Sequence, residues 1–221
     1  MELGFRVRLF IVIATSRGLR MGALSGLSGL SGLSGVAGGS STFLVYDTFT
    51  DTNGTNITAH TPETGGAWTA GIGGGSIQSG QVRLSGGAHN AIIQDVSVAD
   101  VTITGSFTFN SNLDLRLIAN YVDSANYWMG YWSGTNLVIY EVTAGALTAR
   151  ASGTVATAVN GETVTVELRT SGDTIYWKAR GTQINYNVAS RPRKTATKHG
   201  FGGYDPYALG SSACDGIMIT T

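Results

Sequence analysis

An aromatic cluster near the middle of the chain offers the clearest candidate chemistry. The segment Tyr127-Trp-Met-Gly-Tyr-Trp132 carries four aromatic rings within six residues. On a strand, Tyr127 and Tyr131 point to one face of the sheet, and Trp128 and Trp132 point to the other. One pair is expected in the core, whereas the other is either covered by a second layer or exposed. An exposed pair of rings is a stacking platform for sugars or part of a subunit interface.

Paired carboxylates are the second chemistry to consider, because glycoside hydrolysis uses two carboxyl groups that face each other across the scissile bond. Glu162 and Glu167 lie five residues apart, so on one strand they point to opposite faces. Asp114 has Arg116 at the same strand parity, and we expect an ion pair there rather than an acid–base couple. The sequence therefore predicts a non-enzymatic protein, with Asp114 and Arg116 as further candidates for a sugar site.

Oxygen ligands for calcium occur in one short segment. Asp51-Thr-Asn53-Gly54 places side-chain oxygens at alternate positions, followed by a glycine that permits a turn. Such segments are also ordinary turns, so both interpretations stay open, with Asp51, Asn53 and Glu63 as the candidate calcium ligands. The single cysteine, Cys214, excludes an intrachain disulfide and a four-cysteine zinc site.

The charge balance limits the classes of partner. The chain has 14 Lys and Arg residues against 14 Asp and Glu residues, and this zero net charge gives no overall attraction to nucleic acid or to an acidic membrane surface. The apolar run from Leu9 to Ala14 is far shorter than the roughly 20 residues of a spanning helix, so no membrane span is expected. The one basic run, Arg191 to His199, is interpreted as a solvated loop, with an anionic glycan or a capsid surface as the alternative partner.

Strands must position these side chains. Glycine makes up 32 of the 221 residues and charged residues only 13%, a composition that disfavours helices and favours an all-β protein. From Val101 to Phe109, apolar residues alternate with Thr and Ser, which is typical of a half-buried antiparallel strand. About a dozen such strands, separated by regular turn signals, fit two large stacked antiparallel sheets, a jelly roll. The expected strands cover 43–49, 76–84, 90–97, 101–109, 113–117, 126–132, 136–142, 146–152, 163–169, 174–180, 183–188, 199–204 and 215–220.

Five short motifs are distributed over this region. They are Tyr46-Asp-Thr-Phe-Thr-Asp-Thr-Asn-Gly-Thr55, Ala59-His-Thr-Pro-Glu-Thr-Gly-Gly-Ala-Trp68, Asp114-Leu-Arg-Leu-Ile-Ala-Asn-Tyr121, Asn126-Tyr-Trp128 and Cys214-Asp-Gly-Ile-Met-Ile219. Together they resemble the concanavalin A-like or laminin-G-like jelly-roll domain of tailed-bacteriophage structural proteins. The resemblance implies that the first and last strands are adjacent in one sheet, with Phe49 near Ile217 and Ile219. It also implies that calcium is a possible cofactor, and it leaves function open, because this fold hosts lectins, glycanases, adhesion modules and spacers.

The first 20 residues are interpreted as an anchor segment. The run from Arg6 to Ala14 is β-branched and apolar. A lone strand is not stable in water, so we expect it to add to the edge of another sheet through main-chain hydrogen bonds. Arg8, Phe10 and Val12 are the candidate contact residues.

Residues 21–41 contain the repeat GLSGLSGLSG, with glycine at every third position. A three-chain helix needs glycine at that spacing. A purely solvated linker has no reason to repeat an apolar residue such as Leu27, Leu30 and Leu33. We interpret the segment as a stalk that orders by packing against copies of itself, with a trimer favoured. A flexible linker is the alternative. The jelly roll then occupies residues 42–221.

These features predict a virion structural protein, namely a fibre, a spike or a capsid decoration, exposed on the particle surface. Its lectin-like head would bind a host-surface carbohydrate, and weak sites would gain avidity from repetition on one particle. The first alternative is an extracellular filament whose subunits donate the N-terminal strand to one another. The second is a secreted carbohydrate-binding module or glycanase.

Overall fold

The computed structural model describes residues 42–85, 87–109, 114–205 and 212–221. The expected anchor and stalk, with Arg8, Phe10, Val12, Leu27, Leu30 and Leu33, lie outside these residues. Within them, the chain forms fifteen strands and one 3-10 turn, η1 (Ile57–Ala59), and no α-helix. No helix in the described ranges is long and apolar enough to cross a membrane. The prediction of an all-β fold is confirmed.

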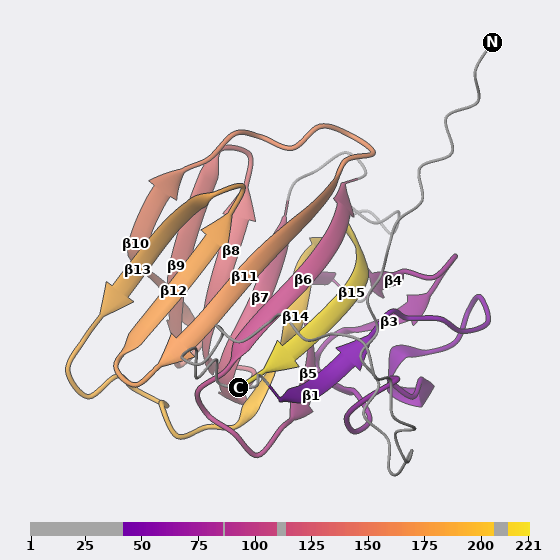
Figure 1. Cartoon of the computed structure of the whole chain (residues 1–221), viewed down its shortest axis with the longest axis horizontal. Coiled ribbons are helices and arrows are strands. Elements are labelled where there is room, and N and C mark those ends of the chain that lie inside the picture. The colour runs from indigo at the N-terminus through magenta and orange to yellow at the C-terminus, as the bar shows by residue number, and fades with distance from the viewer. Residues whose placement is uncertain (1–41, 86, 110–113, 206–211) are drawn as a thin grey trace, which may run out of the picture. The chain divides into compact units, whose positions relative to one another are not determined.

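The strands form two antiparallel sheets, and Figure 1 shows the larger one in front of the smaller. The eight-stranded sheet has the order β13 (Thr182–Asn187), β12 (Thr174–Ala179), β11 (Thr163–Ser171), β6 (Thr102–Phe109), β15 (Ser212–Thr220), β4 (Val82–Ser85) and β3 (Gly74–Ile77), and β1 (Phe43–Asp47) also pairs with β15. The seven-stranded sheet has the order β10 (Ala146–Thr154), β9 (Asn136–Thr143), β8 (Asn126–Ser133), β7 (Leu115–Asp123), β14 (Lys198–Asp205), β5 (Gly87–Asp95) and β2 (Thr69–Ile72). This is the two-sheet sandwich that the sequence predicts.

Alternation of side chains along the strands builds the core between the sheets. In β6, Ile103, Phe107 and Phe109 are buried, whereas the Thr and Ser residues between them are partly exposed. From the opposite sheet, β8 contributes Trp128 and Trp132, whose exposed fractions are 0%. The rings of Phe109 and Trp132 meet at 5.6 Å. Because each fully buried large apolar side chain contributes about 1.5–3 kcal/mol, this layer supplies the main driving force for folding.

The first strand pairs with the last, since β1 runs antiparallel to β15, as the resemblance implies. Phe49 belongs to the same core cluster as Ile217 and Ile219, and its ring packs on Phe201 at a distance of 5.5 Å.

Two details of the strand prediction were wrong. The expected strand 76–84 is divided into β3 and β4 by a turn in which Ser79 and Gly80 have φ angles of 56° and 72°, and two consecutive positive φ angles are typical of a tight hairpin turn. The edge strand β2 was not predicted.

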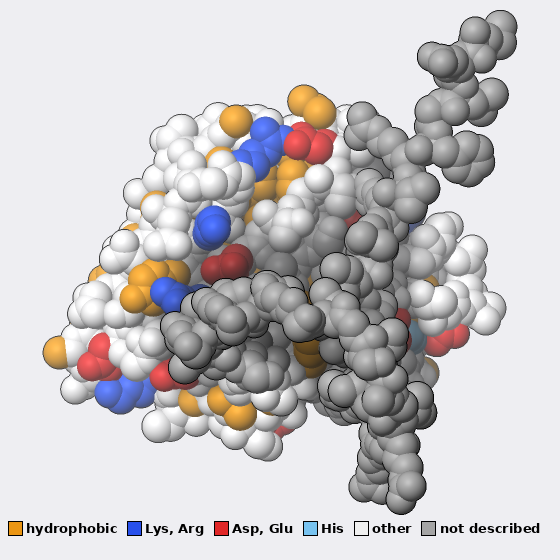
Figure 2. All heavy atoms as spheres, viewed as in Figure 1, with side chains coloured by type: hydrophobic (Ala, Val, Ile, Leu, Met, Phe, Trp, Pro, Cys, Tyr) orange, Lys and Arg blue, Asp and Glu red, His pale blue; other side chains and the backbone are white. Residues whose placement is uncertain are grey.

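Around β11, the outer face of the eight-stranded sheet is polar, as expected for a sheet that meets water on one side. On β11, Thr163, Thr165 and Arg169 are exposed and alternate with buried Val164, Val166 and Leu168. Figure 2 views the molecule from this side, and most of its described surface is white, the colour of the backbone and of uncharged polar side chains. The part of this face around β11 is therefore an ordinary solvated surface, whereas Tyr46 on β1 is exposed and pairs with Met218.

Candidate functional site

The outer face of the seven-stranded sheet is apolar, unlike that of the larger sheet. A second hydrophobic cluster, separate from the core, is formed by outward-pointing residues of β5, β7, β8 and β9. Ile72, Tyr131 and Tyr140 pack against this cluster and remain partly exposed. Because a solvated outer face ordinarily carries polar side chains, this face is where a binding surface is expected. The buried members of the cluster are Ala91, Ile93, Ile118, Tyr121, Tyr127, Met129 and Val142.

Two glycines on β14 shape this face. A Cβ atom on Gly200 would overlap the carbonyl oxygen of Ile92, and one on Gly202 would overlap that of Asn90. Only glycine therefore lets β14 approach the backbone of β5 this closely. As a result, a strip without side chains runs between β7 and β5, and longer side chains from β7 extend over it.

Tyr121 is one of these longer side chains. Its hydroxyl donates to the carbonyl oxygen of Gly71 at 3.0 Å, which links β7 to the β2 edge of the sheet. Its ring lies 5.7 Å from that of Tyr127. Both tyrosines are almost fully buried, so they fill this part of the face and leave no room there for a ligand.

Arg116 is the other long side chain, and it forms a buried ion pair with Asp114. Its Nε donates to Asp114 Oδ1 at 2.8 Å, and its Nη2 donates to Asp114 Oδ2 at 2.7 Å, which confirms the expected pair. Its Nη1 lies 2.6 Å from His89 Nδ1. Since a guanidinium has only donors, His89 accepts this hydrogen bond and carries its own proton on Nε2.

The charges of this cluster balance. Burial raises the pKa of Asp114, although the hydrogen bonds from Arg116 act in the opposite direction. Burial lowers the pKa of His89, and the Arg116 charge lowers it further. His89 is therefore neutral at neutral pH, and the Arg116–Asp114 pair has no net charge.

Tyr131 and Tyr140 are the partly exposed rings beside this cluster. The Arg116 guanidinium carbon lies 5.5 Å from the centre of the Tyr131 ring, and the Tyr131 and Tyr140 rings lie 5.6 Å apart at an angle of 69°. A cation over one ring face and an edge-to-face neighbour fix the orientation of Tyr131. The face therefore presents two fixed aromatic rings next to a hydrogen-bonded polar group.

The predicted sugar-binding residues fall into two groups. Strand parity separates Tyr127 and Tyr131 from Trp128 and Trp132, as the sequence predicts. Both tryptophans lie in the core, where Trp128 Nε1 donates to Pro192 O and Trp132 Nε1 donates to Gly134 O. They are out of reach of a ligand on either outer face.

Asp114, Arg116 and Tyr131 do come together. Sequence reasoning missed His89 and Tyr140, which join them from β5 and β9. The available signal was the alternation of Gly200 and Gly202 around buried Phe201, which marks a strip of β14 without outward side chains.

The predicted calcium ligands each form hydrogen bonds within the protein. Asp51 binds His60 and the backbone N–H of Thr52. Asn53 accepts a hydrogen bond from the backbone N–H of Ser79 at 2.7 Å, and Glu63 accepts one from that of Thr48 at 3.1 Å. No group of three or more His, Cys, Asp or Glu side chains suited to a metal occurs among the described residues.

Asp51 instead belongs to a histidine-centred cluster. His60 places Nδ1 3.0 Å from Asp51 Oδ2 and Nε2 2.9 Å from Asp47 Oδ1. Fully buried Asp47 also accepts hydrogen bonds from Trp68 Nε1 and from the backbone N–H of Phe49. Burial disfavours the imidazolium, but the hydrogen bonds to Asp51 and Asp47 outweigh burial and raise the pKa of His60. The cluster ties β1 to the segment that leads into β2.

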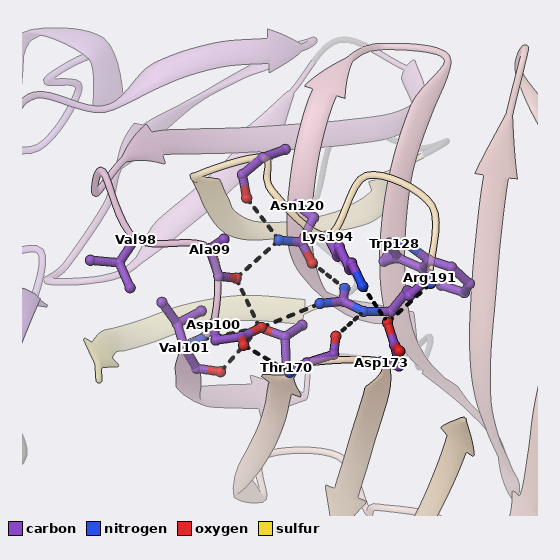
Figure 3. Close-up of polar contacts among 12 residues, drawn as sticks. Val98, Ala99, Asp100, Val101, Asn120, Trp128, Thr170, Asp173, Arg191 and Lys194 are labelled. Atoms are coloured by element: carbon purple, nitrogen blue, oxygen red, sulfur yellow. Dashed lines mark hydrogen bonds and ion pairs between the residues drawn. The ribbon is translucent and has the colours of Figure 1, made fainter. Parts of the chain in front are cut away.

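The basic run is not a freely solvated loop, and that interpretation is corrected here. Arg191 is 1% exposed, and Figure 3 shows its guanidinium surrounded by hydrogen-bond partners. Its Nε donates to Gly172 O at 3.0 Å, its Nη2 lies 3.3 Å from Asp100 Oδ1, and its Nη1 donates to the side-chain oxygen of Asn120. Lys194 pairs with Asp173 at 2.8 Å. Arg191 and Lys194 therefore have hydrogen-bond or ion-pair partners within the protein.

His199, at the end of this run, is fully buried. Its Nδ1 accepts from the backbone N–H of Asn120 at 3.3 Å, and its Nε2 lies 2.9 Å from the carbonyl oxygen of Val98. Burial lowers the pKa of His199 to about 4. It is therefore a neutral structural residue.

Comparison with solved structures identifies the fold. The chain resembles a carbohydrate-binding module of Bacillus subtilis, CBM66, with a TM-score of 0.52 and 13% identity over 70% of this chain and 91% of that one. It also resembles the exoplasmic/lumenal domain of VIP36 in its Ca²⁺/Man2-bound form, with a TM-score of 0.53 and 12% identity over 80% of this chain and 87% of that one. The fold is the concanavalin A-like jelly roll. No protein-family model and no curated protein matches the sequence of the chain.

Proposed function

We propose that this protein is a non-enzymatic carbohydrate-binding protein and that its site is the Tyr131–Tyr140 face of the seven-stranded sheet. The observation that carries the proposal is the pair of partly exposed rings held beside the buried Arg116–Asp114 pair. Sugar rings stack their C–H faces on such aromatic rings, and adjacent polar groups bind their hydroxyls. Both named neighbours are carbohydrate-binding proteins by description, which supports the proposal.

The chemistry of Asp114 favours binding over hydrolysis. Both of its carboxylate oxygens accept hydrogen bonds from Arg116, so it is held as a structural anion rather than as a proton donor. An acid–base mechanism would need a second carboxyl facing it across the bound sugar. We therefore keep the non-enzymatic assignment.

Calcium has no part in this proposal. The neighbouring VIP36 structure is described as Ca²⁺-bound, but Asp51, Asn53 and Glu63 of this chain are engaged in three separate sets of hydrogen bonds.

The test of the proposed function is a glycan array followed by titration calorimetry. We expect Tyr131→Ala to lower the affinity for the bound sugar about tenfold, because a stacking ring is lost. The matched control is Tyr176→Ala, since Tyr176 lies under Arg169 at 4.1 Å on the outer face of the other sheet. An equal loss in both variants, or no loss in either, would contradict the assignment of this face.

The N-terminal segments support a second, independent proposal about assembly. We propose that residues 1–20 anchor the protein to a tailed-bacteriophage virion and that residues 21–41 oligomerise, so that several heads face the host surface. The glycine at every third position supports the oligomerising stalk, and the apolar, β-branched run from Arg6 to Ala14 supports the anchor. A filament built by strand donation is the competing proposal.

Substitution of Leu27, Leu30 and Leu33 by Ser in the full-length protein tests the stalk. If the leucines pack copies of the repeat together, light scattering should show a trimer or larger assembly for the wild type and a monomer for the variant. A monomeric wild type would make the repeat a plain linker.

A further inference from the structure

Three apolar side chains on the outer face of the seven-stranded sheet lie on one diagonal. Tyr140 of β9 pairs with Met129 of β8, and Tyr131 is the next outward-pointing residue along β8. Tyr140 also pairs with Ala149 of β10, and Leu147 is the next outward-pointing residue along β10 in the direction away from Tyr131. Diagonal neighbours of this kind are close enough for large side chains to touch. The line runs from β8 across β9 to the edge strand β10.

All three side chains remain accessible. Tyr131 and Tyr140 are partly exposed, and Leu147 is 47% exposed. A single exposed leucine needs no explanation, but Leu147 continues the line of an aromatic pair that is already fixed by Arg116. Together they form a diagonal line of accessible apolar side chains, which we call the path, beside the buried cluster.

The two ends of the path differ. At the inner end, Arg116, Asp114 and His89 supply polar groups, and beyond them the hydrogen bond from Tyr121 to Gly71 closes the face. At the outer end, β10 is the last strand of the described sheet, and β9 is its partner there. A long ligand that starts at the Arg116 cluster and follows the diagonal therefore leaves the sheet over β10.

We propose that the ligand is a glycan chain of several sugar units that lies along this diagonal, with one end at the Arg116 cluster and the remainder leaving over Leu147. The proposal rests on the carbohydrate-binding function above and adds the length and direction of the ligand. Each additional sugar ring covers a further apolar side chain, first Tyr131, then Tyr140 and then Leu147. Affinity therefore rises with chain length until Leu147 is covered.

The experiment uses titration calorimetry on the full-length protein. The probes are a monosaccharide-to-hexasaccharide series of the neutral glycan that binds best on the array. We expect Leu147→Ser to lower the affinity for the longest chain by about fivefold, because an apolar contact is lost, and to leave the affinity for the monosaccharide unchanged. Val159→Ser is the matched control, since Val159 is 67% exposed in the connection between β10 and β11.

The outcomes separate the two proposals. Rising affinity with length, together with a loss confined to long chains in Leu147→Ser, supports the path. Saccharide binding that is independent of length, or a Leu147→Ser variant equal to wild type with every probe, overturns the path and leaves the proposed function standing. If no saccharide binds, both proposals are overturned.

Discussion

His199 shows how burial can set the protonation state of a residue. The folded protein keeps this side chain neutral down to a pKa of about 4, whereas in the unfolded chain it takes up a proton below about pH 6.5. The unfolded state therefore binds more protons between these values. Consequently, the stability contributed by neutral His199 is fully present above pH 6.5 and is lost as the pH falls towards 4.

The corresponding prediction concerns the variant His199→Gln. An amide can replace both hydrogen bonds, to Asn120 and Val98, without taking up a proton. Urea denaturation at pH 7 and pH 5 should show that the wild type loses about 2 kcal/mol more than the variant between these two pH values. An identical pH dependence would contradict the assignment. His60→Gln is an informative control, because the raised pKa of His60 gives a contribution of opposite sign that disappears as the pH rises.

At the scale of an element, β14 owes its position to two residues without side chains. Gly202 lies where β14 approaches the backbone of β5, and a Cβ atom there would overlap the carbonyl oxygen of Asn90. Backbone atoms cannot rotate away as a flexible side chain can. Since β14 separates Arg116 on β7 from His89 on β5, the same contact holds the polar end of the candidate site together.

We therefore expect Gly202→Ala to destabilise the protein by about 1–3 kcal/mol, the usual cost of overpacking, and to weaken sugar binding. Gly74→Ala is the matched control, because its added Cβ would meet nothing nearer than Ser85 Oγ at 4.0 Å; we expect it to stay within about 0.5 kcal/mol of wild type. Thermal or urea unfolding of both variants measures the difference. Equal stabilities would show that β14 can shift without cost.

The positions of the strands along the chain were more predictable from the sequence than the order in which the strands lie side by side in the sheets. Alternation between buried and solvated positions directly specifies strands such as β6. The same rule predicted that Tyr131 and Trp132 point to opposite faces of β8. It could not show which face of β8 would be covered by the second sheet. Nor could it bring His89 beside Arg116, because that contact depends on the lateral order β7, β14, β5, which local side-chain periodicity does not encode.

At the scale of the whole sandwich, one buried cation connects the two sheets. Arg191 lies in the connection between β13 and β14. It binds Gly172 in the turn between β11 and β12 of the larger sheet, and Asn120 in β7 of the smaller sheet. It also pairs with Asp100, which precedes β6. Arg191 thus stabilises one end of the sandwich.

Removing that cation should weaken the sandwich far more than removing an exposed one. Arg191→Met leaves the oxygens of Asn120 and Gly172 without their donor, and each buried polar group left without its partner costs about 1–3 kcal/mol. Lys194→Met is the matched control, because Lys194 and Asp173 form an exposed pair and exposed ion pairs contribute little to stability. Urea denaturation measures both, and Arg191→Lys serves if the methionine variant does not fold. An Arg191 variant as stable as the Lys194 variant would mean that the sheets hold together through the apolar core alone.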